Sequence, residues 1–142
     1  HRFVKPIMQG LTKLHTLLYK KFGGRFLGTF LGNPICMITA VGRKSGNLRS
    51  IPLLTIPYEN DYILVASSGG SPLHPGWYYN LVNNPKIEMT VNSKTFTANA
   101  NKLSEDEKES IWPYIIKACP FYEEYRQKTT RNIPVFICSA IN

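Results

Sequence analysis

The chain has 142 residues, of which 43% are hydrophobic and 18% charged, so it can bury one core and is not a disordered polypeptide. No apolar run reaches the roughly 18 to 20 residues that a membrane-spanning helix needs, and no signal-peptide pattern is present. The net charge is +8, and residues 1–49 contain nine lysines and arginines but no acidic residue. This excess predicts an anionic partner: nucleic acid, membrane headgroups or a phosphorylated small molecule.

Residues 3–20 carry apolar side chains at helical spacing, with lysines off the apolar stripe, and predict an amphipathic helix. Such a helix packs on its own domain or attaches to a membrane surface. The glycine-rich residues 22–34 predict an irregular segment. We therefore expect an N-terminal helix and glycine-rich segment over residues 1–34, followed by the main domain over residues 35–142.

From Ile35 onward the pattern is that of short strands, which we predict over residues 35–41, 48–56, 62–67, 86–91, 94–101 and 133–140. The first two flank a turn with a basic tip, and Asn92-Ser93 predicts a two-residue hairpin turn. Because the connections are short, six such strands predict an antiparallel sheet curled into a closed or half-closed barrel.

Three helices are predicted within the main domain. A short one covers residues 76–82, and another begins at Ser104, with Glu107 at capping-box spacing. Pro113 is expected to kink or end that second helix. A third helical segment covers residues 122–128.

Cysteines and histidines do not indicate a metal site or disulfides. Cys36, Cys119 and Cys138 are isolated and odd in number, which is typical of a reducing cytosol. His15 lies on the apolar face of the predicted helix, as a packed residue would, and His74 has no neighbouring cysteine or acid. Metal ligands normally come in threes or fours. We expect a cytoplasmic protein, with peripheral attachment to the inner face of the plasma membrane as the alternative.

The basic hairpin tip is a candidate anion site. Arg43, Lys44 and Arg49 place three cations beside the Ser45 hydroxyl. Neighbouring glycines let backbone amides turn toward an anion, and arginine can hold phosphate oxygens through two parallel hydrogen bonds. The alternative is a solvated turn that happens to be basic.

Two further segments contain aromatic side chains next to small or polar residues. Residues 66–81 follow a strand with a Gly/Ser/Pro loop and then Trp77, Tyr78 and Asn80, which suit a planar heterocycle or ordinary core packing. Phe121, Tyr122 and Tyr125 share one helical face, either as a lid over a pocket or as the buried stripe of the helix.

These segments together resemble the deazaflavin-dependent nitroreductase family, small split-barrel proteins that bind coenzyme F420. The resemblance rests on T-x-x-G-R-K-S-G-x-x-R-x-x-P-L over residues 39–53 and on A-S-S-G-G, P-G-W-Y-Y-N-L and N-P over residues 66–85. The C-terminal part is also similar, with Trp112-Pro113, Pro120-Phe121-Tyr122, Tyr125 and Arg131-Asn132-Ile133-Pro134. Ser68 stands where the family usually carries lysine. Leu54 and Cys119 stand where some members carry tyrosine.

The resemblance implies a fold and a set of site residues. The fold is mainly β (α+β), a six-stranded antiparallel split β-barrel of the FMN-binding type, with helices after strands 3 and 5. The phosphate and acidic tail of F420 would be held by Arg43, Lys44, Ser45 and Arg49. The deazaflavin ring would be lined by Pro52, Leu53, Leu54, Ala66, Ser67, Ser68, Gly69, Gly76, Trp77, Tyr78, Tyr79 and Asn80. The acceptor would face the catalytic residues Ser67, Tyr122 and Tyr125.

The function implied is transfer of hydride from reduced F420 to a quinone, enone or nitro acceptor. Two alternatives stay open: an FMN-dependent oxidoreductase on the same barrel, and a non-catalytic lipid or cofactor carrier. Nucleic-acid binding ranks last, because the basic residues are on separate elements and the acidic residues near 104–110 would repel phosphate. We expect a small-molecule electron acceptor as partner, and a monomer or homodimer.

Overall fold

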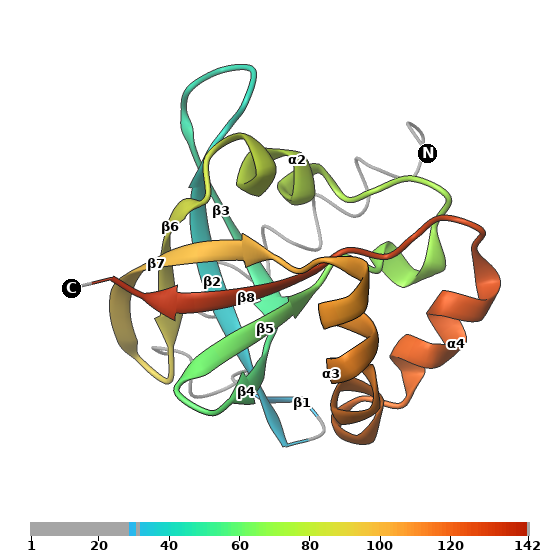
Figure 1. Ribbon diagram of the computed structural model, residues 1–142. Coiled ribbons are helices and arrows are strands. Elements are labelled where there is room, and N and C mark those ends of the chain that lie inside the picture. The colour runs from blue at the N-terminus through green and yellow to red at the C-terminus, as the bar shows by residue number, and fades with distance from the viewer. Residues whose placement is uncertain (1–28, 31, 142) are drawn as a thin grey trace.

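The computed structural model describes residues 29–30 and 32–141 (Figure 1). The predicted helix over residues 3–20 and most of the glycine-rich segment lie outside the described residues. The described strands form one antiparallel sheet: β1 (Thr29–Phe30), β2 (Asn33–Val41), β3 (Leu48–Leu54), β4 (Ile56–Tyr58), β5 (Asp61–Val65), β6 (Lys86–Val91), β7 (Lys94–Lys102) and β8 (Val135–Ala140).

Thr55 joins the two ends of this sheet. The strand order is β1-β2-β6-β7-β8-β5-β4, with β3 paired to β2 off this path. Only Thr55 separates β3 from β4, so consecutive residues leave one end of the sheet and enter the other. The amide of Thr55 donates to the carbonyl of Pro34 at 3.0 Å, and its buried hydroxyl donates to the carbonyl of Ile63 at 3.0 Å. The sheet therefore curls into a half-barrel.

The prediction of a six-stranded barrel is corrected here, because the described sheet has eight strands. The predicted strand 48–56 is divided at Thr55, which bonds to two different strands, and the short β1 pairs with the start of β2. The predicted strand 62–67 is β5 and ends at Val65, and the predicted strand 133–140 begins only at Val135 as β8.

Both predicted hairpins are confirmed. β2 pairs with β3 from Val41↔Leu48 to Ile35↔Leu54. Between β6 and β7, Asn92 and Ser93 have φ angles of 51° and 69°, the left-handed conformation that a type I′ two-residue hairpin turn has at both positions.

The helices are the 3-10 turn η1 (Ser68–Gly70), α2 (Gly76–Asn83), α3 (Glu105–Ala118) and α4 (Phe121–Lys128). The capping box of α3 is confirmed: Ser104 Oγ accepts from the Glu107 amide, and the Ser104 amide donates to Glu107 Oε1 at 2.9 Å. The sequence predicts that Pro113 kinks or ends this helix, and the second outcome is excluded, because α3 continues to Ala118. Trp112 and Ile115, on either side of the proline, are buried, and this burial offsets the backbone hydrogen bond that proline cannot make.

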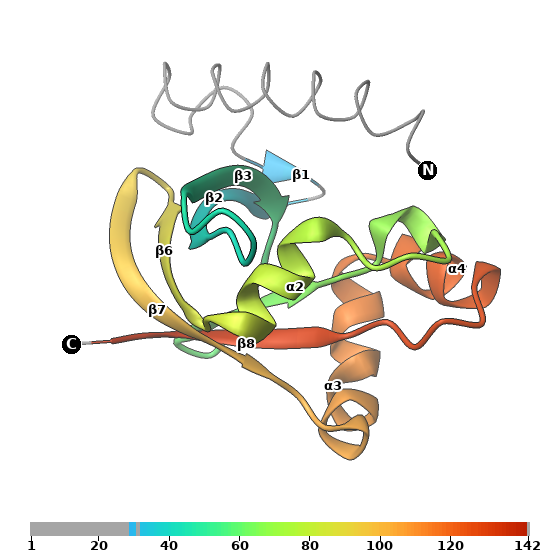
Figure 2. The ribbon, with the colours of Figure 1, turned by 90° about the horizontal axis from the view of Figure 1, so that it is seen from above.

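Successive side chains of a strand point to opposite faces of the sheet, so the buried residues form two clusters. One lies inside the barrel and the other lies between the sheet and the helices α3 and α4. In β5, Leu64 packs inside the barrel whereas Ile63 faces α3 and α4, and in β8 Phe136 and Val135 are divided in the same way. Figures 1 and 2 show α3 and α4 together on one side of the half-barrel and α2 at another edge. Among the described residues, no helix has both the length and the apolar character needed to cross a membrane.

Candidate active site

A pocket of about 280 Å³ opens between β3, β5, η1, the start of α2 and α4. Its walls are mainly apolar, and polar groups come from one loop and one tyrosine. The lining residues are Ile51, Pro52, Leu53, Leu54, Leu64, Val65, Ser67, Ser68, Gly69, Pro75, Trp77 and Tyr122. Its size is near the lower end of the range for small-molecule sites and suits one flat ring system better than a whole dinucleotide-sized ligand.

Seven of the residues predicted to line a flat ring are in this pocket: Pro52, Leu53, Leu54, Ser67, Ser68, Gly69 and Trp77. The Trp77 ring packs against the buried Phe136 ring at a centroid distance of 5.9 Å. Trp77 is therefore attached to the barrel core while it lines the pocket. Gly76 adjoins the pocket residue Pro75, and a Cβ at Gly76 would meet open space.

The other residues predicted to line the ring have different neighbours. Ala66 is fully buried in the barrel core. The Tyr78 ring stacks on His74 at 4.3 Å, and its hydroxyl accepts a hydrogen bond from Lys102 Nζ at 3.1 Å. Tyr79 and Asn80 contact the hairpin tip instead of the pocket.

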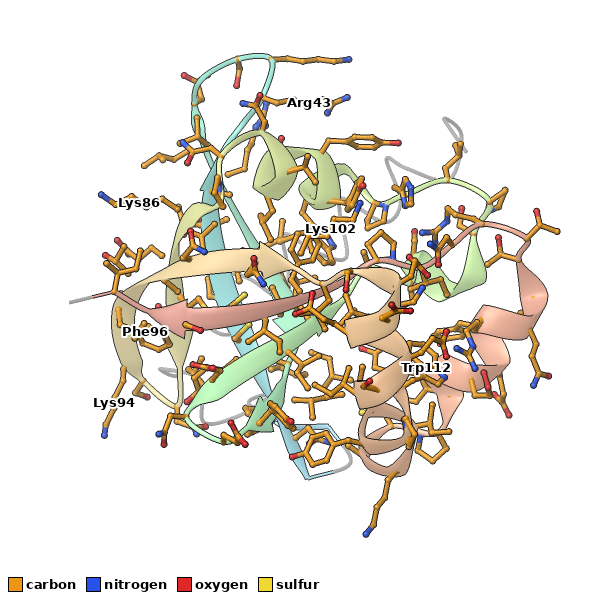
Figure 3. All side chains as sticks on the ribbon, viewed as in Figure 1. Arg43, Lys86, Lys94, Phe96, Lys102 and Trp112 are labelled. Atoms are coloured by element: carbon orange, nitrogen blue, oxygen red, sulfur yellow. The ribbon has the colours of Figure 1, made fainter. Side chains whose placement is uncertain are left out.

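The hairpin tip lies against the same helix that contributes Trp77. The amide of Arg43 donates to Asn80 Oδ1 at 3.0 Å, and the Arg43 guanidinium lies 4.6 Å from the centre of the Tyr79 ring. Figure 3 shows Arg43 directly beside α2. Lys44, Ser45 and Arg49 are exposed on the same hairpin. The hairpin tip and the pocket therefore share one helix, which contacts the tip through Tyr79 and Asn80 and lines the pocket through Trp77.

Gly42 leaves little room for a side chain at the base of this tip. The amide of Gly42 donates to the Asn47 carbonyl at 2.8 Å, and that of Gly46 to the Gly42 carbonyl at 2.8 Å. A Cβ at Gly42 would lie 2.9 Å from Ser45 Oγ and 3.2 Å from the Asn47 carbonyl oxygen. A larger residue would therefore have to displace the Ser45 hydroxyl and press on the Asn47 carbonyl.

The pocket loop, residues 66–74, has an unusual backbone. Ser67 is right-handed helical, with φ −79° and ψ −34°, whereas Ser68, Gly69 and Gly70 have φ of 47°, 64° and 81°. A right-handed residue followed by a left-handed one makes successive amides converge on one concave, anion-accepting surface.

Of the three residues predicted to face the acceptor, Ser67 and Tyr122 line the pocket. Tyr122 is 5% exposed, and burial raises the pKa of its hydroxyl well above the usual range. Tyrosine is protonated near neutral pH at its ordinary pKa, and the raised pKa extends this to alkaline pH, so the Tyr122 hydroxyl can donate a hydrogen bond. Tyr125, predicted for the same role, does not line the pocket but packs beside it, with its ring 6.3 Å from that of Tyr122 and Lys128 Nζ 5.7 Å from its own ring centre.

Arg131 belongs to this site, although the sequence analysis gave it no role. Its guanidinium donates to the carbonyls of Ala66, Ser67 and Ser71 and contacts His74 Nδ1. These partners precede it by 57 to 65 residues, so no local pattern indicates the contact. The one sequence feature that could have indicated a role for Arg131 is its position in the C-terminal motif Arg131-Asn132-Ile133-Pro134.

Comparison with known proteins supplies the family. The model of the F420H(2)-dependent quinone reductase family matches residues 11–140. The chain belongs to this family. The match confirms the resemblance to F420-binding split-barrel proteins and the prediction of an F420-dependent oxidoreductase.

Individual similar proteins support the same family. The chain is 30% identical over 131 residues to the F420H(2)-dependent quinone reductase Rv1261c of Mycobacterium tuberculosis H37Rv, covering 89% of this chain and 88% of the relative. It is 40% identical to the solved F420-H2 dependent reductase FDR-A, with a TM-score of 0.68 and coverage of 75% of this chain and 94% of that one. A solved structure described as a domain-swapped dimer is 37% identical, with a TM-score of 0.69 and coverage of 87% and 98%.

Proposed function

We propose that this chain reduces a quinone with F420H2, binding the deazaflavin ring in the pocket beneath Trp77 and the anionic tail along the β2–β3 hairpin tip. The observation that carries this assignment is the contact of Arg43 with Asn80 and Tyr79. It joins the exposed cations of the tip to the helix that lines the pocket. A ligand with a flat ring at one end and several negative charges at the other matches both features.

The residues present fit this cofactor. Apolar side chains from β3 and β5 offer a flat, water-poor surface for a ring, and the pocket has no lysine or arginine among its lining residues. The cations are instead outside it, at the tip, where a phosphate and an acidic tail need them. When bound, reduced F420 supplies a hydride to the acceptor.

The chain itself contributes positioning and hydrogen bonding. Pro52, Leu54 and Trp77 would hold the reacting groups and exclude water. The Ser67 and Tyr122 hydroxyls would hydrogen-bond to the acceptor oxygen on which negative charge develops. A tyrosine hydroxyl is protonated near neutral pH, and burial raises the pKa of Tyr122 further, so its Oη would hold a proton close to that oxygen. Tyr125 would support this arrangement from the next turn of α4.

The assignment is tested by separating cofactor binding from turnover. We expect wild-type protein to quench F420 fluorescence on binding and to oxidise F420H2 in the presence of a soluble quinone. Replacing Arg43 with alanine should weaken F420 binding about tenfold, because a charge-assisted phosphate contact is lost. Tyr122→Phe should bind F420 normally but turn over quinone more slowly, because only the acceptor contact is removed.

Controls decide between this proposal and its rivals. Circular dichroism should show that both variants fold, and Lys94→Gln, at the far end of the barrel from Arg43 in Figure 3, should behave as wild type. If FMN bound tightly and F420 did not, the flavin alternative would replace the proposal. Bound fatty acid with no hydride transfer to any quinone would favour a carrier.

The predicted partners also include a second copy of the chain and a membrane surface. The domain-swapped dimer among the similar solved structures supports a homodimer as the form to expect in solution, which light scattering would measure. Membrane contact through residues 3–20 stays a prediction, because those residues lie outside the described part of the chain.

A further inference from the structure

Arg131 uses all three guanidinium nitrogens on the pocket loop. Nε donates to the Ser71 carbonyl at 3.0 Å and Nη2 to the Ser67 carbonyl at 2.7 Å. Nη1 donates to the Ala66 carbonyl at 3.1 Å and lies 2.7 Å from His74 Nδ1. One side chain thus joins both ends of residues 66–74.

This arginine is not part of an ion pair among the described residues, where the three salt bridges use Lys108 and Arg126. It is half-buried, and that burial lowers its pKa. A cation whose hydrogen bonds go to carbonyls and an imidazole is not there to neutralise an acid. Its contacts fix the path of the backbone instead.

The consequence for the pocket follows from peptide geometry. The chain has no cis peptide bonds among its described residues, and in a trans peptide the N–H points opposite to the C=O. The carbonyls of Ala66 and Ser67 point at Arg131, so the amides of Ser67 and Ser68 point away from it. Neither amide donates a backbone hydrogen bond within the described residues, and both residues line the pocket.

We propose that Arg131 is the positioning residue of the cofactor pocket: it holds the loop 66–74 so that the Ser67 and Ser68 amides face the bound ligand. The inference rests on the proposed function for the identity of that ligand. Hydrogen bonds from a cation also polarise the two peptide groups and make their amides stronger donors. Lysine could not replace this arginine, because one ammonium cannot span four acceptors with a planar fork.

The test compares Arg131→Lys, Arg131→Ala and Arg126→Lys. Arg126 is the matched control, an equally conservative change at an arginine that pairs with Glu109 and Glu123 and covers the Trp112 ring. Amide hydrogen exchange of residues 66–74, measured without cofactor, reports the loop. F420 fluorescence titration then reports binding, and steady-state kinetics separate kcat from KM.

We expect faster exchange in residues 66–74 alone for both Arg131 variants, and F420 binding weaker by about tenfold or more, the size expected for lost hydrogen bonds to a charged group. Millimolar guanidinium, at constant ionic strength, should partly restore binding to Arg131→Ala. Arg126→Lys should change neither measurement. A purely structural arginine would respond differently, with exchange rising across the sheet and no rescue.

Several results would overturn the proposal. One is that the loop amides of Arg131→Lys exchange at the wild-type rate. Another is that they exchange faster while the affinity for F420 is unchanged. The third is that neither Arg131 variant folds. If wild-type protein did not bind F420, the proposed function would fail. Hydrogen exchange would still decide whether Arg131 orders the loop.

Discussion

His74 links the pocket loop to pH at the scale of a single residue. Its Nδ1 faces Arg131 Nη1 at 2.7 Å, so this nitrogen must be the unprotonated acceptor. The ring stacks on Tyr78 and meets the edge of Tyr79 at 5.8 Å. Burial lowers the pKa of His74 below its usual 6.5, and the positive charges of Arg131 and Lys102 lower it further.

We therefore expect acid to loosen the loop. Above pH 6.5 the imidazole is neutral in both folded and unfolded chains. As pH falls below 6.5, the unfolded chain takes up the proton first, so the free energy of unfolding decreases until the lower folded pKa is passed. His74→Gln keeps an acceptor for Arg131 without this titration and should show a flatter dependence between pH 6.5 and 5.

Urea unfolding at several pH values would measure this difference. The carboxylates with lowered pKa values, Glu105, Glu107 and Glu123, lose their contribution only below their usual 4.5. They therefore do not account for a decrease in the higher window. Parallel curves for wild type and His74→Gln would contradict the expectation.

At the scale of elements, the pocket loop is packed against α4 through a glycine. A Cβ at Gly70 would lie 3.0 Å from the Tyr125 carbonyl oxygen and 3.2 Å from Lys128 Cβ, whereas a Cβ at Gly69 would meet nothing within 4 Å. Both glycines have positive φ, 81° and 64°. Substitution at Gly69 therefore introduces backbone strain alone, whereas substitution at Gly70 introduces the same strain and a steric clash with α4.

Gly69→Ala should destabilise the protein by about 1 to 2 kcal/mol, the cost of a left-handed alanine. Gly70→Ala has the same backbone cost and must also displace α4, which adds about 1 to 3 kcal/mol. Chemical denaturation of both variants measures the difference. Because α4 also carries Tyr122, Gly70→Ala should lower quinone turnover as well. Equal free energies of unfolding for the two variants would show that α4 moves aside without a loss of stability.

At the scale of the whole molecule, charge is distributed unequally. The acidic residues of α3 and α4 are partly neutralised within the domain, since Arg126 pairs with Glu109 and Glu123 and Lys108 pairs with Glu105. Arg43, Lys44 and Arg49 form no ion pair among the described residues and stay exposed at the hairpin tip. The tip therefore has positive charge available for a ligand.

This distribution predicts salt-dependent cofactor binding. Exposed charges are screened beyond about 8 Å at 0.15 M salt, so F420 affinity should fall several-fold as salt rises from about 0.05 to 0.5 M. The double variant Arg43→Gln, Lys44→Gln should bind more weakly and with a flatter salt dependence. Lys94→Gln removes one charge from the opposite end of the barrel and should keep the wild-type slope. Isothermal titration calorimetry at each salt concentration measures the affinity for F420 and hence this slope.

The sequence by itself determined the parts of the fold that depend on neighbours in the chain. The Asn92-Ser93 turn and the Ser104–Glu107 capping box follow local rules of backbone conformation and hydrogen bonding, and the structure has both. The motifs around Arg43 and Trp77 indicated the cofactor, because a known family carries the same residues at the same spacing.

Tertiary structure alone decided what depends on distant partners. Thr55 divides a predicted strand because its amide and hydroxyl bond to Pro34 and Ile63 in different strands. Of the two outcomes predicted at Pro113, a kink or an end, the structure excludes the end, because burial around Trp112 outweighs a lost local hydrogen bond. Arg131 reaches a loop some 60 residues earlier, and only folding brings its guanidinium to those carbonyls. Local sequence sets backbone preference, whereas contacts between remote segments are set by how the sheet closes.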